Sequence, residues 1–346
     1  MKNQRKYEFL LNTTSLLFNL SDYLSLTARY SFNKGSNFGT YWRSAQHKTS
    51  LDPGVAGYAS HSYGEFQDNT LEAFLTYDET FDLHTINAVG GYSFQEFNGQ
   101  GFSANNSDFA VDGIEEHDIG TGRFLSEGRA GLGSYKNPRV RLMAFFGRVN
   151  YSWNNRYLIT ASLRREGSSK FAKGNRWGNF TALSIGWNIH NEPFMQSQNL
   201  FTNLKLRAGF GETGNEGFAP GVATRMYGPD TWWLMNGEWR RTYGVSHNQN
   251  TDLKWETKKE YNLGFDFAIL ECNVYGRFDV FRRDVDDLIY DISVPQPPAI
   301  HDKTTMNVGI LRNTGWEAEV SWNAINKSDF NYTTTLIGSG YKSELV

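Results

Sequence analysis

The sequence predicts an all-β fold of antiparallel strands, and three features support this. Apolar and polar residues alternate with a period of two in one segment after another, as in a strand with one apolar and one polar face. Aromatic residues make up 15% of the chain, which also holds 34 glycines and only 39% hydrophobic residues. This composition suits strands and turns better than helical packing. We expect about twelve strands in one domain over residues 1–346.

The predicted strands pair as hairpins. Residues 9–20 and 23–33 are joined by a tight turn at Ser21 and Asp22, and Leu24, Leu26 and Ala28 share one face of the second strand. The same unit recurs, with short turns, at residues 71–95, 143–164, 260–283 and 316–329. Short turns of this kind make neighbours along the chain antiparallel.

Long connections alternate with these turns. They cover residues 33–68, 98–138, 212–256 and 284–305, with a shorter one at 167–175, and compact soluble domains rarely carry several loops of such length. The apolar stripes span about ten residues, enough for a tilted strand to cross a bilayer. Their polar faces are rich in charge, as in Arg207, Asp266 and Glu319. The sequence therefore predicts part of an antiparallel transmembrane β-barrel, with short periplasmic turns and long extracellular loops.

A water-soluble protein is the alternative. A carbohydrate-binding β-sandwich or a β-propeller, including a propeller hydrolase, shows the same alternation when its apolar faces meet in a dry core. Periodicity does not say whether an apolar face meets lipid or another sheet. The propeller is disfavoured because the hairpins recur without recurring motifs in register.

Several function classes are excluded by composition and motifs. The net charge of −3 argues against a nucleic-acid partner, and a single cysteine, Cys272, permits neither an internal disulfide nor a cysteine-built metal site. The seven histidines show no metal spacing, and hydrolase motifs are lacking. We therefore predict no enzyme activity, cofactor or metal. The start of the chain does not resemble a signal peptide.

Two motifs have a functional and a structural interpretation. Gly209, Gly211 and Gly214 match the dinucleotide fingerprint G-x-G-x-x-G, but the preceding strand alternates and no helix pattern follows. Asp284, Asp286, Asp287 and Asp291 could hold calcium. A solvated loop base is the favoured interpretation, because the glycine and terminal glutamate of a calcium loop are missing.

Particular stretches resemble one known family. "GRVNYSWNNRYLITASLRREGSSKFAKGNRWGNFTALSIGWNIHNEPFM", at residues 147–195, resembles the barrel signature of SusC/RagA-type TonB-dependent transporters. "LKLRAGFGETGN", "LKWETKKEYNLGFDFAI", "RRDVDDLIYDISVP" and "NVGILRNTGWEAEVSW" are similar to later segments of that family, in family order. The resemblance runs from about residue 139 to 337 and is weaker in the first third. It places the three glycines where a strand leaves the barrel wall.

The resemblance implies a function and a location. Members of this family import nutrients across the bacterial outer membrane, so we expect TonB-dependent uptake of an oligosaccharide or a peptide. The implied partners are a SusD-like surface lipoprotein, the TonB-ExbB-ExbD complex and outer-membrane lipid. Relative to the family, the sequence lacks a signal peptide, a TonB box, a plug domain and the terminal strand, so we expect a middle portion of a transporter.

One loop is the candidate ligand surface. The stretch "DTWWLMNGEWRRTYG" combines flat aromatic rings, which can stack on sugars, with guanidinium groups that can bind hydroxyl or acidic groups. The alternatives are that these residues pack the loop on itself or belong to an interfacial aromatic girdle. The predicted substrate-binding residues are Trp232, Trp233, Trp239, Arg240, Arg241 and Tyr243.

Overall fold

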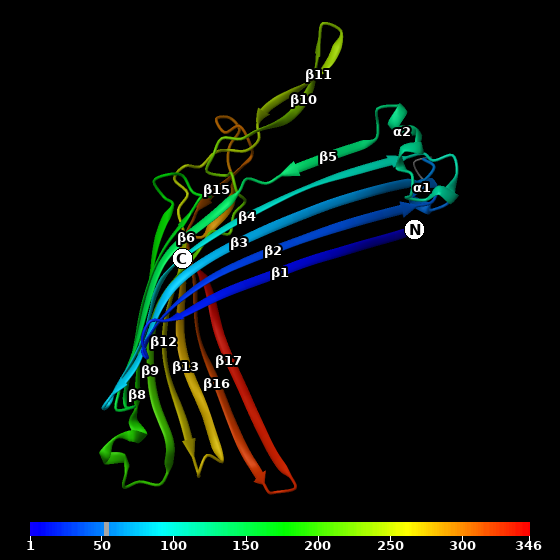
Figure 1. Cartoon of the computed structure of the whole chain (residues 1–346). Coiled ribbons are helices and arrows are strands. Elements are labelled where there is room, and N and C mark those ends of the chain that lie inside the picture. The colour runs from blue at the N-terminus through cyan, green and yellow to red at the C-terminus, as the bar shows by residue number, and fades with distance from the viewer. Residues whose placement is uncertain (52–54) are drawn as a thin grey trace. The chain divides into compact units, whose positions relative to one another are not determined.

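The protein is built almost entirely from strands (Figure 1), as a computed structural model of residues 1–51 and 55–346 shows. No helix in these residues is long and apolar enough to cross a membrane. The strands are β1 (Lys2–Asn19), β2 (Leu24–Arg43), β3 (Tyr58–Phe81), β4 (His84–Ser107), β5 (Gly131–Lys136), β6 (Val140–Trp153), β7 (Tyr157–Ser168), β8 (Trp177–Asn188), β9 (Phe201–Asn215), β10 (Tyr227–Met235), β11 (Glu238–Val245), β12 (Glu256–Ile269), β13 (Val274–Asp286), β14 (Ile289–Ser293), β15 (Lys303–Asn307), β16 (Ile310–Asn326) and β17 (Asn331–Leu345).

One antiparallel sheet contains most of the strands. Its order is β1-β2-β3-β4-β6-β7-β8-β9-β12-β13-β16-β17, with β5 paired to β4. The hairpins β10–β11 and β14–β15 form two small sheets of their own. Short helical turns interrupt the connections: α1 (Lys48–Leu51), α2 (Arg123–Ser126), η1 (Asp112–Ile114), η2 (Ile119–Thr121), η3 (Ile189–Asn191) and η4 (Pro193–Met195). The predicted all-β antiparallel class is confirmed, and the main sheet has close to the predicted number of strands.

The chain divides into two compact units. The first comprises Met1–Leu16, Arg29–Leu71 and Phe94–Arg141. Its small core contains Trp42, Ala59 and Phe109, and the two aromatic rings meet edge to face at 5.1 Å. The second unit comprises Leu17–Ala28, Glu72–Ser93 and Leu142–Val346, and carries the two small hairpin sheets.

Every predicted short turn is present in the second unit. Between β6 and β7, Asn154 and Asn155 both have a φ of 49°, the left-handed backbone that tight hairpin turns need and that asparagine tolerates. Further turns lie at 20–23, 82–83, 270–273 and 327–330. The connection between β8 and β9, with η3 and η4, is a longer one that the sequence did not reveal.

The long connections are shorter than expected, because the strands extend into them. The expected loop at 33–68 contains the end of β2 and the start of β3, and its residues 52–54 lie outside the described chain. The loops at 98–138, 212–256 and 284–305 likewise contain β5, β10, β11, β14 and β15. Strands of up to 24 residues (β3 and β4) exceed the ten or so that a bilayer requires.

The apolar side chains of the sheet in the second unit face outward from it. Leu183, Leu263, Val280 and Trp316 share one face through successive strand pairings, and each is 41–51% exposed. A sandwich or propeller would bury such a face against a second layer. The alternative of a dry-cored soluble protein is therefore wrong for this sheet, and the face suits lipid.

The opposite face of the same sheet carries paired charges. Arg207 contacts Asp266 at 2.8 Å and Asp279 at 3.1 Å, and Arg277 contacts Glu319 at 2.8 Å. These residues come from four adjacent strands, β9, β12, β13 and β16. A water-lined interior is where a barrel places such a face.

Aromatic rings gather at the short-turn end of the apolar face. Trp153, Tyr157 and Trp187 stack in sequence across β6, β7 and β8, with ring centroids 5.5 and 6.5 Å apart. His84 of β4 stacks on Trp153 at 6.5 Å. Such a row is typical of the interfacial girdle of a membrane barrel.

The three glycines of the G-x-G-x-x-G pattern all lie inside β9. Gly209 and Gly211 pair with β8 on one side and β12 on the other, so the expectation that they mark the exit of the strand is wrong for these two. Gly214 lies beyond the segment of β9 that pairs with β8, and a Cβ there would come 2.1 Å from the ring of Phe180. Gly214 therefore allows the backbone of β9 to pass close to the Phe180 ring, which a larger residue would prevent.

Candidate functional site

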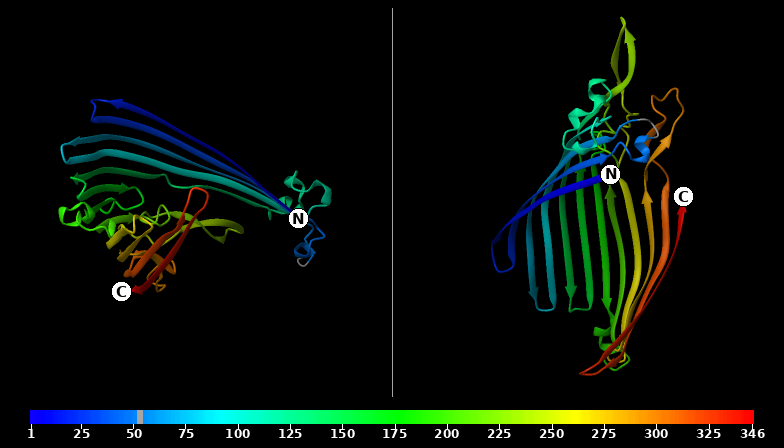
Figure 2. Two further views of the ribbon diagram at one scale, coloured as in Figure 1. Left: turned by 90° about the horizontal axis from the view of Figure 1, so that it is seen from below. Right: turned by 90° about the vertical axis from the view of Figure 1, so that its right-hand side faces the viewer.

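The predicted binding residues lie together on the hairpin β10–β11. Asn236 and Gly237 form its turn with φ values of 55° and 81°, which is the Asn-Gly signature of a two-residue hairpin. The register pairs Trp232 with Arg241 and Trp233 with Arg240. The hairpin extends beyond the ends of β9 and β12, away from the strands of the second unit (Figures 1 and 2).

The hairpin divides these residues between two faces. Alternation places Trp232, Trp239, Arg241 and Tyr243 on one face, with Trp233 and Arg240 on the other. The guanidinium carbon of Arg241 lies 5.5 Å from the centre of the Trp232 ring, a cation–π distance. One face therefore presents three aromatic rings and one cation.

These side chains are open to solvent. Trp232, Trp233, Trp239 and Tyr243 are 55–72% exposed, so the interpretation that the loop packs on itself is wrong. The girdle interpretation is not supported either, because the hairpin that carries these residues extends beyond the ends of β9 and β12 (Figures 1 and 2). Arg240 pairs with Glu238 at 3.2 Å on the exposed rim of the hairpin.

A buried aromatic cluster supports the base of this region. Phe171, Phe180, Phe218, Leu253 and Trp255 form it, and they come from β8 and from the loops that follow β7, β9 and β11. The Trp255 ring lies 5.0 Å from that of Phe171, and its Nε1 donates to the Arg176 carbonyl at 2.9 Å. Burial of these rings fixes the loop bases without regular secondary structure.

Asparagines connect the loop between β11 and β12 to the segment that contains β14 and β15. The amide of Asn248 donates to the carbonyls of His301 and Lys303 at 2.7 and 2.9 Å. Its oxygen accepts from the backbone N–H groups of Ile300 and His301, each at 3.1 Å. Sequence reasoning missed this connection, although the asparagine-rich stretch "SHNQN" was a possible signal.

Two further asparagines extend the connection. Asn250 donates to the Thr305 carbonyl at 2.9 Å. Asn307 donates to the carbonyls of Lys254 and Asp287 at 2.9 and 2.8 Å. We call residues 246–255 and 287–307, with these contacts, the loop clamp.

The loop clamp reaches the foot of the hairpin. A ring nitrogen of His301 lies 2.5 Å from the Val245 carbonyl, and the Ser246 N–H donates to the Met226 carbonyl at 2.9 Å. Both strands of the hairpin are thus attached where they leave the base.

The aspartates considered for calcium are engaged by other groups. Arg282 and Arg312 both contact Asp284, at 2.7 and 2.8 Å. Lysines pair with Asp286 and Asp287, and the Thr305 hydroxyl donates to Asp291. The carboxylates form separate ion pairs and hydrogen bonds, which agrees with a loop base and not with a calcium site.

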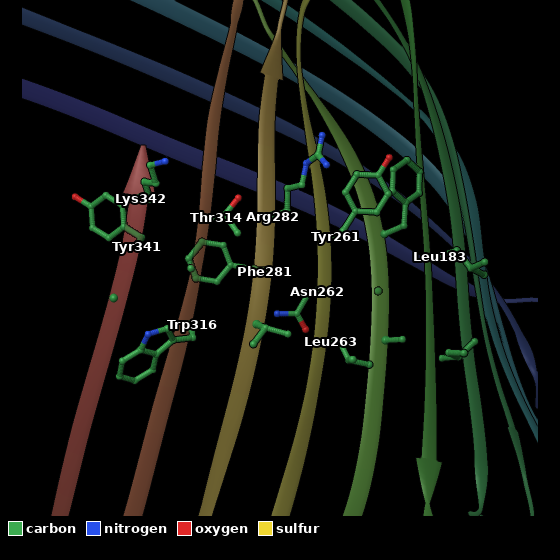
Figure 3. Close-up of a pocket in the computed structure, with 17 residues that line it drawn as sticks. Leu183, Tyr261, Asn262, Leu263, Phe281, Arg282, Thr314, Trp316, Tyr341 and Lys342 are labelled. Carbon is green, nitrogen blue, oxygen red and sulfur yellow. The ribbon is translucent and has the colours of Figure 1, made fainter. Parts of the chain in front are cut away.

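An apolar groove of about 1000 Å³ lies on the outward face of the sheet (Figure 3). Leu183, Leu263 and Trp316 line it, and Arg282 and Lys342 lie toward one end. Because it belongs to the apolar face, membrane lipid is its expected occupant.

Together, these features define a class. An antiparallel sheet with an exposed apolar face, a charged opposite face, an aromatic girdle and long clamped loops is an outer-membrane β-barrel domain. The family model described as "TonB dependent receptor-like, beta-barrel" matches residues 2–344. The chain belongs to this family and is a SusC/RagA-type barrel of the outer membrane.

Several relatives support the assignment. The chain is 28% identical over 329 residues to TonB-dependent receptor P3 of Formosa agariphila, covering 92% of this chain and 32% of the relative. It is 34% identical over 251 residues to TonB-dependent receptor SusC of Bacteroides thetaiotaomicron, covering 66% of this chain and 24% of SusC. The chain thus spans a third or less of these relatives.

Solved structures share the fold. The RagAB peptide transporter superposes with a TM-score of 0.84 at 19% identity, over 99% of this chain and 37% of the other. A siderophore receptor, PiuA from Acinetobacter baumannii, gives a TM-score of 0.56 at 14% identity, over 99% of this chain and 47% of that one. At these identities the likeness concerns the fold alone.

Proposed function

We propose that this protein serves TonB-dependent import of a nutrient across the outer membrane, and that the nutrient is an oligosaccharide or a peptide. Membership of the barrel family supports this proposal, as does similarity to SusC. The observation that carries it is the exposed face of the β10–β11 hairpin. Three aromatic rings and a cation projecting from clamped loops form a surface suited to capture.

The chemistry of this surface is non-covalent. Trp232, Trp239 and Tyr243 offer flat apolar rings, on which the C–H faces of sugars or the side chains of a peptide stack. Arg241 supplies donors in a fixed planar arrangement that suits hydroxyl and carboxylate oxygens. Capture of this kind needs no cofactor, and it precedes passage through the barrel.

The partners belong to the same proposal. A SusD-like lipoprotein closes over the long loops once ligand is bound, and TonB-ExbB-ExbD supplies the force that opens a path through the barrel. We favour an oligosaccharide, because two tryptophans and a tyrosine on one open face suit stacking on sugar rings. A peptide is the second candidate, since the structural neighbour RagAB is a peptide transporter.

The experiment is ligand binding by the purified full chain, combined with growth of a strain that produces it on either glycans or peptides. The double variant Trp232→Ala with Trp239→Ala removes the aromatic face. Each ring contributes on the order of 1 kcal/mol, so affinity should fall roughly tenfold or more. The matched control is Phe194→Ala, which removes an exposed aromatic ring at the short-turn end of the sheet, away from the hairpin. Unchanged binding by the double variant would refute a role for the hairpin.

A further inference from the structure

Three consecutive side chains converge in the first unit. Glu115, Glu116 and His117 follow η1 in the connection between β4 and β5, and one ligand atom from each lies within 4.8 Å of the others. In extended backbone, consecutive side chains point to opposite faces. Glu115 has a φ of 55°, which turns the chain so that its neighbours can meet.

The middle carboxylate is buried and incompletely satisfied. Glu116 is 5% exposed, and its Oε2 has no hydrogen-bond partner among the described residues. The Lys2 ammonium pairs with Glu115 Oε2, while the ring of His61 contacts the backbone carbonyl of Glu116 at 2.7 Å. A buried acceptor without a partner is costly, and a buried charge more so. Although the Lys2 ammonium lies at the cluster, Glu116 Oε2 is left without a direct partner.

The segment that carries the cluster is held in place. The Ala45 N–H donates to Asp112 Oδ1 at 2.9 Å, and the Phe109 N–H donates to the Ala56 carbonyl at 2.6 Å. Phe109 itself packs against Trp42 in the core of the unit. The three side chains thus start from an anchored backbone, which lowers the cost of bringing them together.

We propose that Glu115, Glu116 and His117 bind a divalent transition-metal ion of the zinc type. Two carboxylates and one imidazole are a donor set for such ions, whereas calcium and magnesium favour oxygen ligands alone. The ion neutralises Glu116 and occupies its free Oε2, and water completes the coordination. Lys2 competes with it, because the ammonium holds the same Glu115 carboxylate. Sequence reasoning predicted no metal, since histidine spacing alone does not show this convergence.

The test is titration of the purified full chain in detergent with Zn²⁺, followed by calorimetry, with Co²⁺ as a spectroscopic probe of nitrogen ligation. We expect one equivalent to bind. Glu116→Gln and His117→Ala should each weaken binding at least about tenfold, and Lys2→Ala should strengthen it. Glu127→Gln, which removes a carboxylate charge from the same loop, is the matched control and should leave binding unchanged.

Other outcomes overturn the proposal. Failure to bind Zn²⁺, equal affinity for Ca²⁺, or binding that survives both Glu116→Gln and His117→Ala would each contradict it. A folding defect is distinguished by thermal unfolding without metal. Glu116→Gln removes a buried charge, so the metal-free variant should be at least as stable as the wild type.

Discussion

Asn248 offers the sharpest test of how the long loops are held. Its side chain makes four hydrogen bonds to the backbone of residues 300–303, two as donor and two as acceptor, at 2.7–3.1 Å. Asn248→Ala removes all four. At about 1 kcal/mol for each net hydrogen bond, less what water recovers at a partly exposed site, we expect the local opening free energy to fall by about 2–3 kcal/mol.

Hydrogen exchange measures this change directly. A loss of about 2–3 kcal/mol accelerates exchange of the Ile300 and His301 amides by roughly 30- to 140-fold, while amides within β12 and β13 should be unaffected. Asn250→Ala is the graded control. Asn250 makes one bond to the Thr305 carbonyl and accepts one from the Asp252 N–H, so its effect should be about half as large in free energy. Equal exchange in wild type and Asn248→Ala would show that the clamp does not hold the loop.

Three further predictions concern other parts of the chain. Gly214→Ala should destabilise the protein by about 1–3 kcal/mol in thermal unfolding, because the new Cβ would lie 2.1 Å from an aromatic ring, whereas a Cβ at Gly209 would come no closer than 3.9 Å to its neighbours, so Gly209→Ala should be tolerated. Burial raises the pKa of Glu216 above its usual range, so folding favours its protonated form. The protection of the loop amides against hydrogen exchange should therefore be greatest at acidic pH and should decline as the pH rises through the raised pKa. Glu216→Gln should abolish that decline. Leu263→Arg places a charge on the apolar face and should cost about 2–4 kcal/mol in lipid vesicles, while Asn262→Arg, on the opposite face, should fold normally; equal costs would contradict the assignment of the lipid face.

The barrel class could be predicted from the sequence because its signals are local. Alternation assigns each side chain to a face, as for Leu263 and Asn262, and short turns such as Asn154 and Asn155 join antiparallel neighbours. Neither signal depends on residues far away in the chain. The ends of the strands were harder to predict. Beyond the apolar stripe the strands continue with polar and aromatic residues that resemble loop sequence, as in Tyr58–Phe81.

The loop contacts could not be predicted, because they join distant positions. Asn248 and His301 are separated by 53 residues, and the sequence around an asparagine does not indicate which distant residue it will bond. The hairpin residues were recognised by type, but their division into two faces was not predicted, because it requires the pairing across the turn at Asn236 and Gly237. The Glu115–His117 cluster escaped notice for a similar reason. Its convergence depends on one left-handed backbone angle, which no residue type at that position demands.

The loop clamp also bears on how capture would be linked to the barrel. His301 contacts the Val245 carbonyl at the foot of the hairpin, and Asn248 binds the backbone of the same His301. Asn307, at the end of β15, attaches Lys254 to Asp287 beside the ends of β12 and β13. A ligand bound to the hairpin therefore contacts a segment whose backbone is fixed, through the loop clamp, to the ends of barrel strands. If the proposed capture role is right, Asn248→Ala should weaken ligand binding even though Asn248 lies outside the aromatic face, because the face loses its fixed orientation.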